Sequence, residues 1–457
     1  MAKSNYDFDI IIIGSGAAGS VAAESVARIH KKVAIVESSY LGGSAPNISD
    51  IPLGTLLNIA HVFSAARNSK NFGLRTNAFG YNYPSIKSWK DLVVRRSGAS
   101  STGEYLESRG IKVFRGRAHF IGKNEISIGR RHLSADKFII ATGSQQSIPV
   151  IHGLSEVDFL TPETAINLLK PPKSLAIIGA GATGVQFAEL FATFGTKVHL
   201  FDIKKRILSR MDDEISHALA DIFTHSRGME IHTSSKIISM RIDKPSIQIK
   251  FFQGEIGKSV KVEKILVATG QIPNVDIGLE NANVEYDQSG IRVNENLVTS
   301  ARNIFAAGDV LGKCNTTQSA IYEAHIAAHN ATKREKRIAN YQAMPHVVWT
   351  NPEIATVGAT ESDLIREDIK FHSSIAQNSA VSRANVANFT TGFTKILTDQ
   401  KGVLLGATVM SPHAAEIIGE FGIAIKNNMT AFQIADTIHP FGSWSEVARL
   451  ACAKIRA

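Results

Sequence analysis

A glycine-rich turn followed by an acid occurs twice in this chain, and this repeat constrains the fold more than any other feature. The first copy is Gly14-Ser-Gly16-Ala-Ala-Gly19 with Glu37, and the second is Gly179-Ala-Gly181-Ala-Thr-Gly184 with Asp202. In both copies the acid follows the first glycine by 23 residues, and an apolar, strand-like run precedes the turn. Strand, turn, helix, strand and acid in this order predict a dinucleotide-binding unit.

Each part of this pattern has a physical role. The first glycine permits the tight turn, the second lets a pyrophosphate approach the backbone, and the third lets the helix pack closely on the sheet. The acid accepts hydrogen bonds from ribose hydroxyls, and Asp202 would repel a 2′-phosphate, which favours NAD over NADP at the second site. The bases Lys204, Lys205 and Arg206 follow this acid directly and keep NADP as an alternative.

The chain divides further at proline and charge boundaries. Its 457 residues suggest roughly three domains. Pro171-Pro172 precedes the second glycine turn, and after Arg337 the pattern changes to strands alternating with amphipathic helices. We predict an α/β chain whose parts are 1–149 with 272–341, 150–271, and 342–457.

Composition excludes several classes of protein. Cys314 and Cys452 are the only cysteines, so a disulfide scaffold, a zinc-finger array and a closely spaced dithiol are excluded, and we expect no metal site. A net charge of +9 is small for this length and does not predict nucleic-acid binding. The N-terminal apolar run, Ile10 to Ile13, is too short for a signal peptide or a membrane span, so we expect a cytoplasmic protein without membrane insertion.

Three further motifs carry a family resemblance. They are Ala306-Ala-Gly-Asp309, Thr350-Asn-Pro352-Glu-Ile-Ala355 and Gly392-Phe-Thr-Lys395-Ile. Together with the two glycine turns they resemble the FAD-dependent pyridine nucleotide-disulfide oxidoreductases, which include dihydrolipoamide dehydrogenase, glutathione reductase and mercuric reductase. The resemblance implies two Rossmann-like domains: an FAD-binding and central domain of 1–149 with 272–341, and an NAD(P)-binding domain of 150–271. It also implies a C-terminal α+β dimerisation domain of 342–457 and a homodimer.

The resemblance also implies the residues that hold the two cofactors. For FAD they are Gly14, Gly16, Gly19, Glu37, Gly43, Ser44, Ala118, Thr142, Gly143, Asp309 and Gln318. For NAD they are Gly179, Gly181, Gly184, Asp202 and Gly270.

The redox centre departs from the family pattern. The family has two cysteines with four residues between them and then a lysine, whereas this chain has Ala45, Asp50 and Gly54 at those positions. The glutamate that pairs with the lysine in relatives is matched by Gln186. The two losses are consistent, because a buried acid without its cation would cost several kcal/mol. Ala182 matches a tyrosine that shields the flavin in many relatives.

The C-terminal signature departs in the same direction. The segment from Thr437 to Glu446 keeps the first histidine, His439, and the glutamate, Glu446, but has Phe441 where relatives have the catalytic histidine. A phenyl ring cannot transfer a proton, and dithiol chemistry needs both a thiolate and a base. Reduction of disulfides by the family route is therefore not expected.

Other residues leave two interpretations open. Asp50 is a proton donor to a reduced acceptor or the cap of the helix that follows it, and the capping role is favoured. Cys314 is a reactive thiol or an ordinary cysteine, and His439 is a substitute base or a structural residue. Phe441 and Trp444 form a platform for a flat acceptor or fill the space left by the missing residues.

These observations predict an FAD-dependent NAD(P)H oxidoreductase without a dithiol. Electrons would pass from the flavin to a small-molecule acceptor such as a quinone, a dye, a second nicotinamide nucleotide or oxygen. Two alternatives remain: a catalytically idle flavoprotein that acts as a scaffold or redox sensor, and an atypical thiol or disulfide reductase that uses Cys314.

Overall fold

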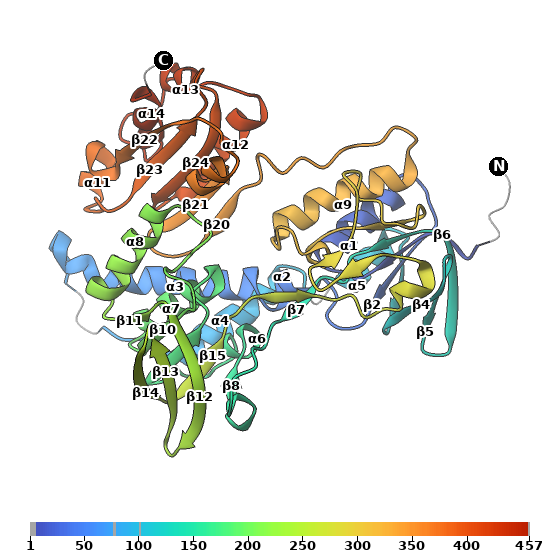
Figure 1. Ribbon diagram of the computed structural model, residues 1–457, viewed down its shortest axis with the longest axis horizontal. Coiled ribbons are helices and arrows are strands. Elements are labelled where there is room, and N and C mark those ends of the chain that lie inside the picture. The colour runs from blue at the N-terminus through green and yellow to red at the C-terminus, as the bar shows by residue number, and fades with distance from the viewer. Residues whose placement is uncertain (1–5, 76–78, 100–101, 456–457) are drawn as a thin grey trace. The chain divides into compact units, whose positions relative to one another are not determined.

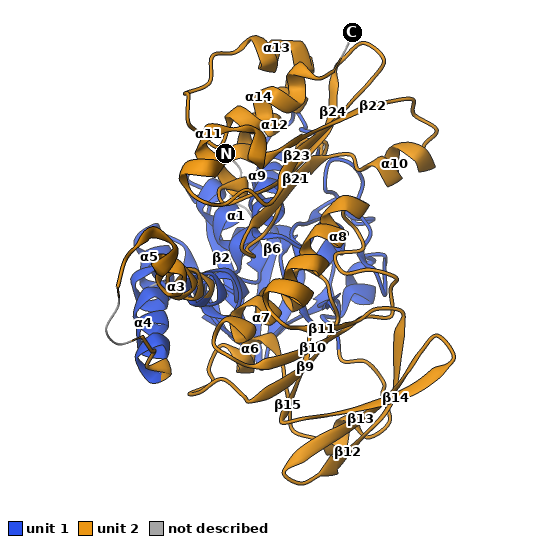
Figure 2. Ribbon diagram, turned by 90° about the vertical axis from the view of Figure 1, so that its left-hand side faces the viewer, with its two compact units in different colours: residues 1–56, 84–147, 270–339 blue, residues 57–83, 148–269, 340–457 orange. Residues whose placement is uncertain are grey.

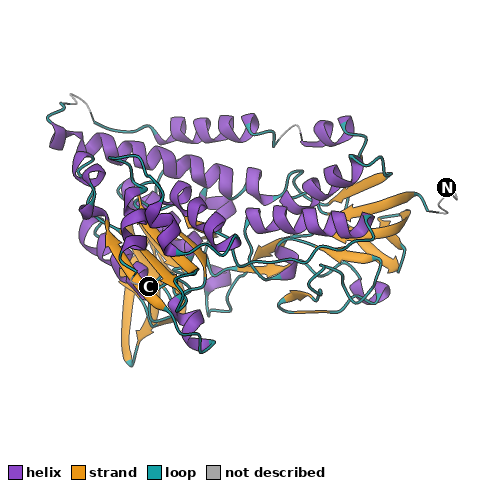
Figure 3. Ribbon diagram, turned by 90° about the horizontal axis from the view of Figure 1, so that it is seen from above, coloured by secondary structure: helices purple, strands orange, loops and turns teal. Residues whose placement is uncertain are grey.

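A computed structural model describes residues 6–75, 79–99 and 102–455 (Figure 1). The chain contains both helices and strands, as expected for an α/β protein (Figure 3). The chain forms two compact units: unit 1 contains 1–56, 84–147 and 270–339, and unit 2 contains 57–83, 148–269 and 340–457 (Figure 2).

Unit 1 is built on a seven-stranded sheet in the order β3-β2-β1-β6-β5-β4, with β19 also paired to β6. The strands β3, β2, β1, β6 and β19 pair in parallel, and β6, β5 and β4 pair antiparallel. Parallel strands buried on both faces read as continuous apolar runs, which explains the sequence of β1 and β2. The bounds are Phe8–Ile13 for β1, Val33–Glu37 for β2, Lys112–Arg115 for β3, Ala118–Gly122 for β4, Glu125–Ile128 for β5, Arg131–Ile140 for β6 and Ile304–Ala306 for β19.

Helices α1 (Ala17–Ala27) and α9 (Thr317–Thr332) of unit 1 pack against each other and against this sheet. Their alanine-rich inner faces join the strands in one apolar core, because small side chains allow close approach of helix and sheet. The remaining elements of unit 1 are short, apart from α4 and the start of α3. They are α2 (Ser44–Asn47), α3 (Asp50–Asn68, which continues into unit 2), α4 (Tyr83–Arg96, whose first residue lies in unit 2), α5 (Thr102–Ser108), β7 (Ser144–Gln146), β16 (Gln271–Pro273), η4 (Leu279–Ala282), β17 (Tyr286–Asp287), β18 (Gly290–Ile291) and η5 (Asp309–Leu311).

Unit 2 contains a second parallel sheet in the order β11-β10-β9-β15-β8, beside an antiparallel sheet β12-β13-β14. Apolar residues of both sheets share one core cluster. The bounds are Phe159–Leu160 for β8, Ser174–Ile178 for β9, Lys197–Phe201 for β10, Glu230–His232 for β11, Ser235–Asp243 for β12, Ser246–Gln253 for β13, Ile256–Val262 for β14 and Lys264–Val267 for β15, with η1 (Ser69–Phe72), η2 (Leu154–Glu156), α6 (Pro162–Ala165), α7 (Ala182–Thr193), α8 (Asp213–Asp221) and η3 (Ile222–Ser226) as the other elements of this part.

The C-terminal part of unit 2 is an antiparallel sheet in the order β20-β21-β24-β23-β22, with α12 packed on β21 and β24. It has its own apolar core. Its elements are β20 (His346–Val348), β21 (Glu353–Gly358), α10 (Glu361–Arg366), β22 (His372–Gln377), η6 (Asn378–Ala380), α11 (Ser382–Val386), β23 (Phe393–Thr398), β24 (Leu404–Ser411), α12 (Ala414–Lys426), α13 (Ala431–Asp436) and α14 (Glu446–Ala453).

The three-part division predicted from the sequence stays a prediction, because the two units join 148–269 with 340–457. The apolar run Ile10 to Ile13 lies within β1, and a helix follows each glycine turn as expected. Within the described residues, no helix is both long and apolar enough to cross a bilayer.

Candidate functional site

The first glycine turn lies at the carboxyl end of β1 and is closed by close backbone contacts. Gly14 has a φ of +102°, and a Cβ added there would lie 2.2 Å from the carbonyl oxygen of Ala141. A Cβ on Gly19 would lie 1.9 Å from the carbonyl oxygen of Gly14. Only glycine fits at either position, so the roles expected for the first and third glycines hold in the structure.

The second turn, at the end of β9, repeats this geometry. Gly179 has a φ of +103°, and a Cβ there would lie 2.3 Å from the carbonyl oxygen of Ala268. A Cβ on Gly184 would lie 1.8 Å from the carbonyl oxygen of Gly179. The sequence repeat is therefore also a structural repeat, one copy in each unit.

The two acids are held in the same way. The Glu37 carboxylate accepts hydrogen bonds from the backbone N–H of Ser15 at 2.8 Å and of Ser39 at 2.7 Å. The Ser15 hydroxyl also donates to the oxygen that accepts from the Ser15 N–H, at 2.8 Å. These bonds fix the carboxylate beside the glycine turn, and the oxygen bound to Ser39 keeps a lone pair for a ribose hydroxyl.

Asp202 repeats the arrangement in unit 2. Its carboxylate accepts from the backbone N–H of Ala180 and of Lys204, both at 2.8 Å. Of the basic residues that follow, Arg206 forms an ion pair with Asp213 at 2.6 Å, while Lys204 and Lys205 are exposed.

The helices after the two turns offer free backbone donors. Their N-caps, Gly16 and Gly181, make no side-chain cap hydrogen bond, and neither first turn contains an acid. In contrast, α9 is closed by a capping box of Thr316 and Ser319. An uncapped N-terminus presents N–H groups and the positive end of the helix dipole, which suits a pyrophosphate. The residues of both turns thus fit a bound dinucleotide.

Other residues expected at the FAD site gather in unit 1. Gly43 packs so closely that a Cβ there would lie 2.5 Å from Cα of Gly16, and Ser44 begins α2 directly after it. The Thr142 hydroxyl donates to the carbonyl of Asn274 at 2.7 Å, and the Asn274 side chain donates back to the carbonyl of Thr142 at 2.9 Å. Asn274 was not among the expected residues. Only its position shortly after Gly270 could have indicated it.

Asp309 and Asp50 are electrostatic neighbours in unit 1. The Ser144 hydroxyl donates to Asp309 at 3.0 Å. Burial raises the pKa of Asp309; the Ser144 hydrogen bond opposes this shift and the charge of Asp50 adds to it. Asp50 is the first residue of α3, and its carboxylate accepts a hydrogen bond from the Thr317 hydroxyl at the start of α9. The predicted helix is present, but Asp50 is its first residue rather than the cap before it, and its carboxylate ties α3 to α9.

The other expected positions lie in strands, in helices and in the turns beside them. Ala118 is buried at the start of β4, Gly143 follows Thr142 with a φ of +66°, and Gln318 is the second residue of α9. Ala45 lies within α2. Gly270 lies shortly after β15 with a φ of +102°, and a Cβ added there would meet no atom within 4 Å.

Neither cysteine lies in surroundings that favour a thiolate. Burial raises the pKa of the half-buried Cys314, and the nearby carboxylate of Glu323 raises it further. Cys452 is buried in α14, and burial raises its pKa to about 12. A thiolate is the reactive form, so both thiols are poor nucleophiles at neutral pH.

Residues of the C-terminal signature make hydrogen bonds within the C-terminal part. The His439 ring lies 2.9 Å from Glu420 and 2.8 Å from the carbonyl of Thr437, and the Glu446 carboxylate accepts from the backbone N–H of Gly442 at 2.8 Å. Trp444 is buried against Phe389, whereas Phe441 is 85% exposed. The two aromatic rings therefore do not fill one common space in the described chain.

Two positions at which the chain departs from the family pattern, Ala182 and Gln186, lie in α7. Ala182 is its exposed first residue, and the Gln186 side chain accepts from the backbone N–H of Trp349 at 3.2 Å. A neutral amide at position 186 is thus held by the backbone and needs no cation.

Comparison with family models agrees with this geometry. Residues 8–324 match the pyridine nucleotide-disulphide oxidoreductase model, and residues 344–452 match the dimerisation domain of the same family. The chain belongs to the pyridine nucleotide-disulphide oxidoreductase family. Its members are FAD-dependent oxidoreductases that use NAD(P)H, and the dimerisation domain supports a homodimer.

Curated relatives and solved structures extend over nearly the whole chain. A mercuric reductase of Bacillus cereus is 32% identical over 98% of this chain and 72% of its own length. A dihydrolipoyl dehydrogenase of Geobacillus stearothermophilus is 30% identical over 96% of this chain and 94% of its own. A HOCl-induced flavoprotein disulfide reductase of Escherichia coli superposes with a TM-score of 0.88 at 25% identity, covering 98% of this chain and 100% of its own.

Proposed function

We propose that this protein is an NADH-dependent FAD oxidoreductase that passes electrons from the flavin directly to a small-molecule acceptor. One observation carries the proposal: both glycine turns and their acids have a geometry suited to dinucleotides, while Ala45 and Asp50 stand where the family resemblance places the dithiol. Bound FAD would accept a hydride from the nicotinamide and give its electrons to the acceptor.

The residues of the chain supply binding and electrostatics. The backbone N–H groups at the start of α1 would hold the FAD pyrophosphate, and Glu37 its ribose, from a carboxylate already oriented by Ser15 and Ser39. The start of α7 and Asp202 would hold NADH in the same way. Asp309, held by Ser144, would accept from the ribityl chain.

Two features support NADH over NADPH. The Asp202 carboxylate is fixed beside the second turn, where it would repel a 2′-phosphate. Arg206 is already paired with Asp213. The exposed Lys204 and Lys205 are the residues that would support NADPH. The ratio of kcat/KM for NADH to that for NADPH therefore tests the preference, and we expect it to be above one.

The direct route to the acceptor is tested with a variant that contains no thiol. Cys314→Ser combined with Cys452→Ala removes every cysteine of the chain. We expect anaerobic NADH to bleach the visible flavin absorbance of this variant as fast as in the parent, and reduction of a quinone to continue unchanged. The proposal fails if NADH leaves the flavin of the parent oxidised, which is the result expected of an idle flavoprotein.

The single variant Cys314→Ser tests the alternative that the protein is a thiol or disulfide reductase. The relatives named above include dihydrolipoyl dehydrogenase and a flavoprotein disulfide reductase, so oxidised lipoamide and a synthetic disulfide belong among the acceptors tested. We expect neither to be reduced by the parent, because the pKa of Cys314 is raised by burial. Disulfide reduction that is lost in Cys314→Ser would instead assign the activity to this thiol.

A further inference from the structure

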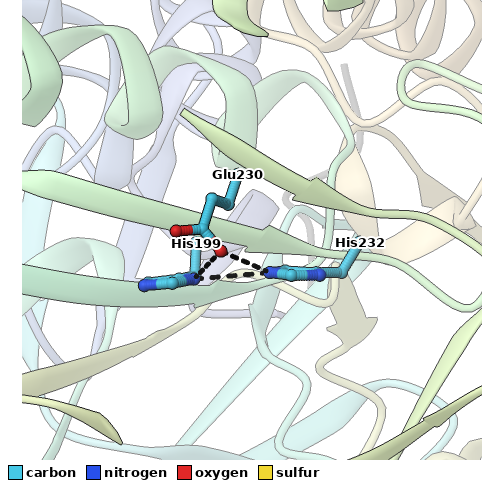
Figure 4. Close-up of side chains that lie close together, drawn as sticks. All are labelled: His199, Glu230 and His232. Carbon is cyan, nitrogen blue, oxygen red and sulfur yellow. Dashed lines mark hydrogen bonds and ion pairs between the residues drawn. The ribbon is translucent and has the colours of Figure 1, made fainter. Parts of the chain in front are cut away.

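Three side chains that coordinate metals well in proteins converge on the edge of the parallel sheet in unit 2. His199 lies on β10, and Glu230 and His232 lie on the edge strand β11 (Figure 4). In the parallel register His199 pairs with Glu230, and Phe201 pairs with His232. Because side chains alternate along a strand, His199, Glu230 and His232 all point to the same face of the sheet.

The distances among their ligand atoms suit a shared ion. Nδ1 of His199 lies 3.3 Å from Nε2 of His232. A Glu230 carboxylate oxygen lies 3.3 Å from the His199 nitrogen and 3.9 Å from the His232 nitrogen. Two ligands held about 2.0–2.1 Å from a tetrahedral ion are about 3.3–3.4 Å apart, so the spacing of the two imidazole nitrogens suits a shared ion.

The packing holds both rings in place. The His232 ring stacks on Phe201 with a centroid distance of 4.5 Å and meets Phe251 edge-on at 5.1 Å. The His199 side chain is 4% exposed and that of His232 is 12% exposed, whereas Glu230 is 43% exposed. The two rings thus have fixed orientations, and the Glu230 side leaves a path to solvent.

One carboxylate oxygen of the cluster stays outside the ion pair that Glu230 forms with lysine. Metal ligation needs neutral imidazoles, and the side chains of His199 and His232 are largely buried, at 4% and 12% exposed. Lys197, which also faces the cluster, binds the other oxygen of Glu230 at 2.8 Å, and Lys258 of β14 adds positive charge near His232. Glu230 therefore keeps one oxygen for the histidines while its second oxygen is neutralised.

From this geometry we propose that His199, Glu230 and His232 form a binding site for a divalent transition metal of the zinc class. Two imidazoles and one carboxylate are a known zinc ligand set, and three protein ligands leave a fourth position for water. The ion would tie the edge strand β11 to β10. The backbone N–H of Asp202 donates to the carbonyl of His232 at 3.0 Å, so the site adjoins the second glycine-turn unit.

The competing interpretation is an ordinary hydrogen-bonded cluster, in which one imidazole N–H is shared between the two rings and the carboxylate. Isothermal titration of the purified full-length protein with zinc chloride, after treatment with a chelator, distinguishes the two. We expect one zinc ion per chain, and we expect His232→Gln to weaken its affinity by more than the roughly 10–100-fold usual for losing a residue that only orients a metal ligand.

Two further variants keep the result interpretable. His225→Gln changes an exposed histidine of the same unit and should bind zinc like the parent. Glu230→Gln changes the partly exposed ligand and should fold even if the histidine variants do not, yet bind zinc more weakly. Cobalt(II) should give the visible absorption of a four-coordinate site in the parent and in His225→Gln, but not in His232→Gln. No zinc binding by the parent, or equal binding by His232→Gln, Glu230→Gln and His225→Gln, would overturn the proposal.

Discussion

At the scale of single residues, Lys395 is the charge whose position the tertiary structure explains best. Its side chain is 1% exposed, and Nζ lies 2.9 Å from Glu214, 3.1 Å from Glu361 and 3.7 Å from Asp212. Burial alone would raise the pKa of Glu214, but the hydrogen bond and charge of Lys395 outweigh it and lower that pKa. One lysine therefore neutralises carboxylates from two segments of unit 2 that are far apart in the sequence.

Removing this lysine should destabilise the protein. Lys395→Met leaves the buried Asp212 carboxylate without its cation, and we expect a loss of about 3–5 kcal/mol in the free energy of unfolding. Urea denaturation followed by circular dichroism measures it. Lys401→Met, at an exposed position of the same unit, is the control and should change stability by less than about 0.5 kcal/mol. Equal stability of the two variants would contradict the role given to Lys395.

A second residue-scale prediction concerns Glu353, which accepts from the backbone N–H of Ala415 at the start of α12. Burial raises its pKa to about 7. The folded state then holds a proton that the unfolded state releases above about pH 4.5, so stability falls as the pH rises from that value to about 7. Partial exposure reduces the size of this effect to roughly 1–2 kcal/mol.

Glu353→Gln cannot ionise and should lose this part of the pH dependence. Urea unfolding at about pH 5 and about pH 8 measures it, and the difference between the two conditions should shrink in the variant. An unchanged difference would show that Glu353 titrates normally in the folded protein.

At the scale of elements, the close approach of α1 to β1 depends on Gly19. Gly19→Ala places a methyl group 1.9 Å from the carbonyl oxygen of Gly14, so helix and turn must separate. We expect the variant to lose FAD during gel filtration, which the ratio of flavin to protein absorbance measures. The matched control is Gly54→Ala inside α3, where no atom lies within 4 Å of the new methyl group. There alanine should stabilise by up to about 1 kcal/mol. Retention of FAD by Gly19→Ala would contradict the interpretation of the turn.

At the scale of the whole molecule, the C-terminal part carries exposed apolar side chains that a single chain leaves in water. Ile438 is 96% exposed, Phe441 is 85% exposed and Phe432 is 74% exposed. This part matches the dimerisation domain of the family. Exposed apolar groups of this kind mark surfaces that bind other proteins, and here we expect a second copy of the chain.

Ile438→Glu should therefore weaken the homodimer, because a charge would be buried without a partner on association. Light scattering coupled to gel filtration measures the mass, and we expect the variant to shift toward the monomer at low micromolar concentration. Val150→Glu changes a fully exposed apolar residue outside the C-terminal part and should leave the dimer intact. Dimers of equal stability in both variants would place the interface elsewhere.

Much of the chain could be predicted from local patterns. The two turns are set by residues within 23 positions of one another, and a φ of +102° at Gly14 and of +103° at Gly179 favours glycine at both. Apolar runs before the two turns predicted the strands β1 and β9, since strands buried on both faces have few polar positions. The metal-ligand cluster was not expected, because His199 and His232 lie 33 positions apart without any metal-binding motif.

The sequence by itself determined the two dinucleotide-binding units, their acids and the absence of a closely spaced dithiol, because each depends on residues near in the chain. Only the tertiary structure decided which distant groups meet. It pairs Asp50 with Thr317, surrounds Lys395 with three carboxylates and brings His199 against His232. These contacts depend on strand register and on helix packing. Sequences with the same local patterns can differ in both, so the local patterns do not determine these contacts.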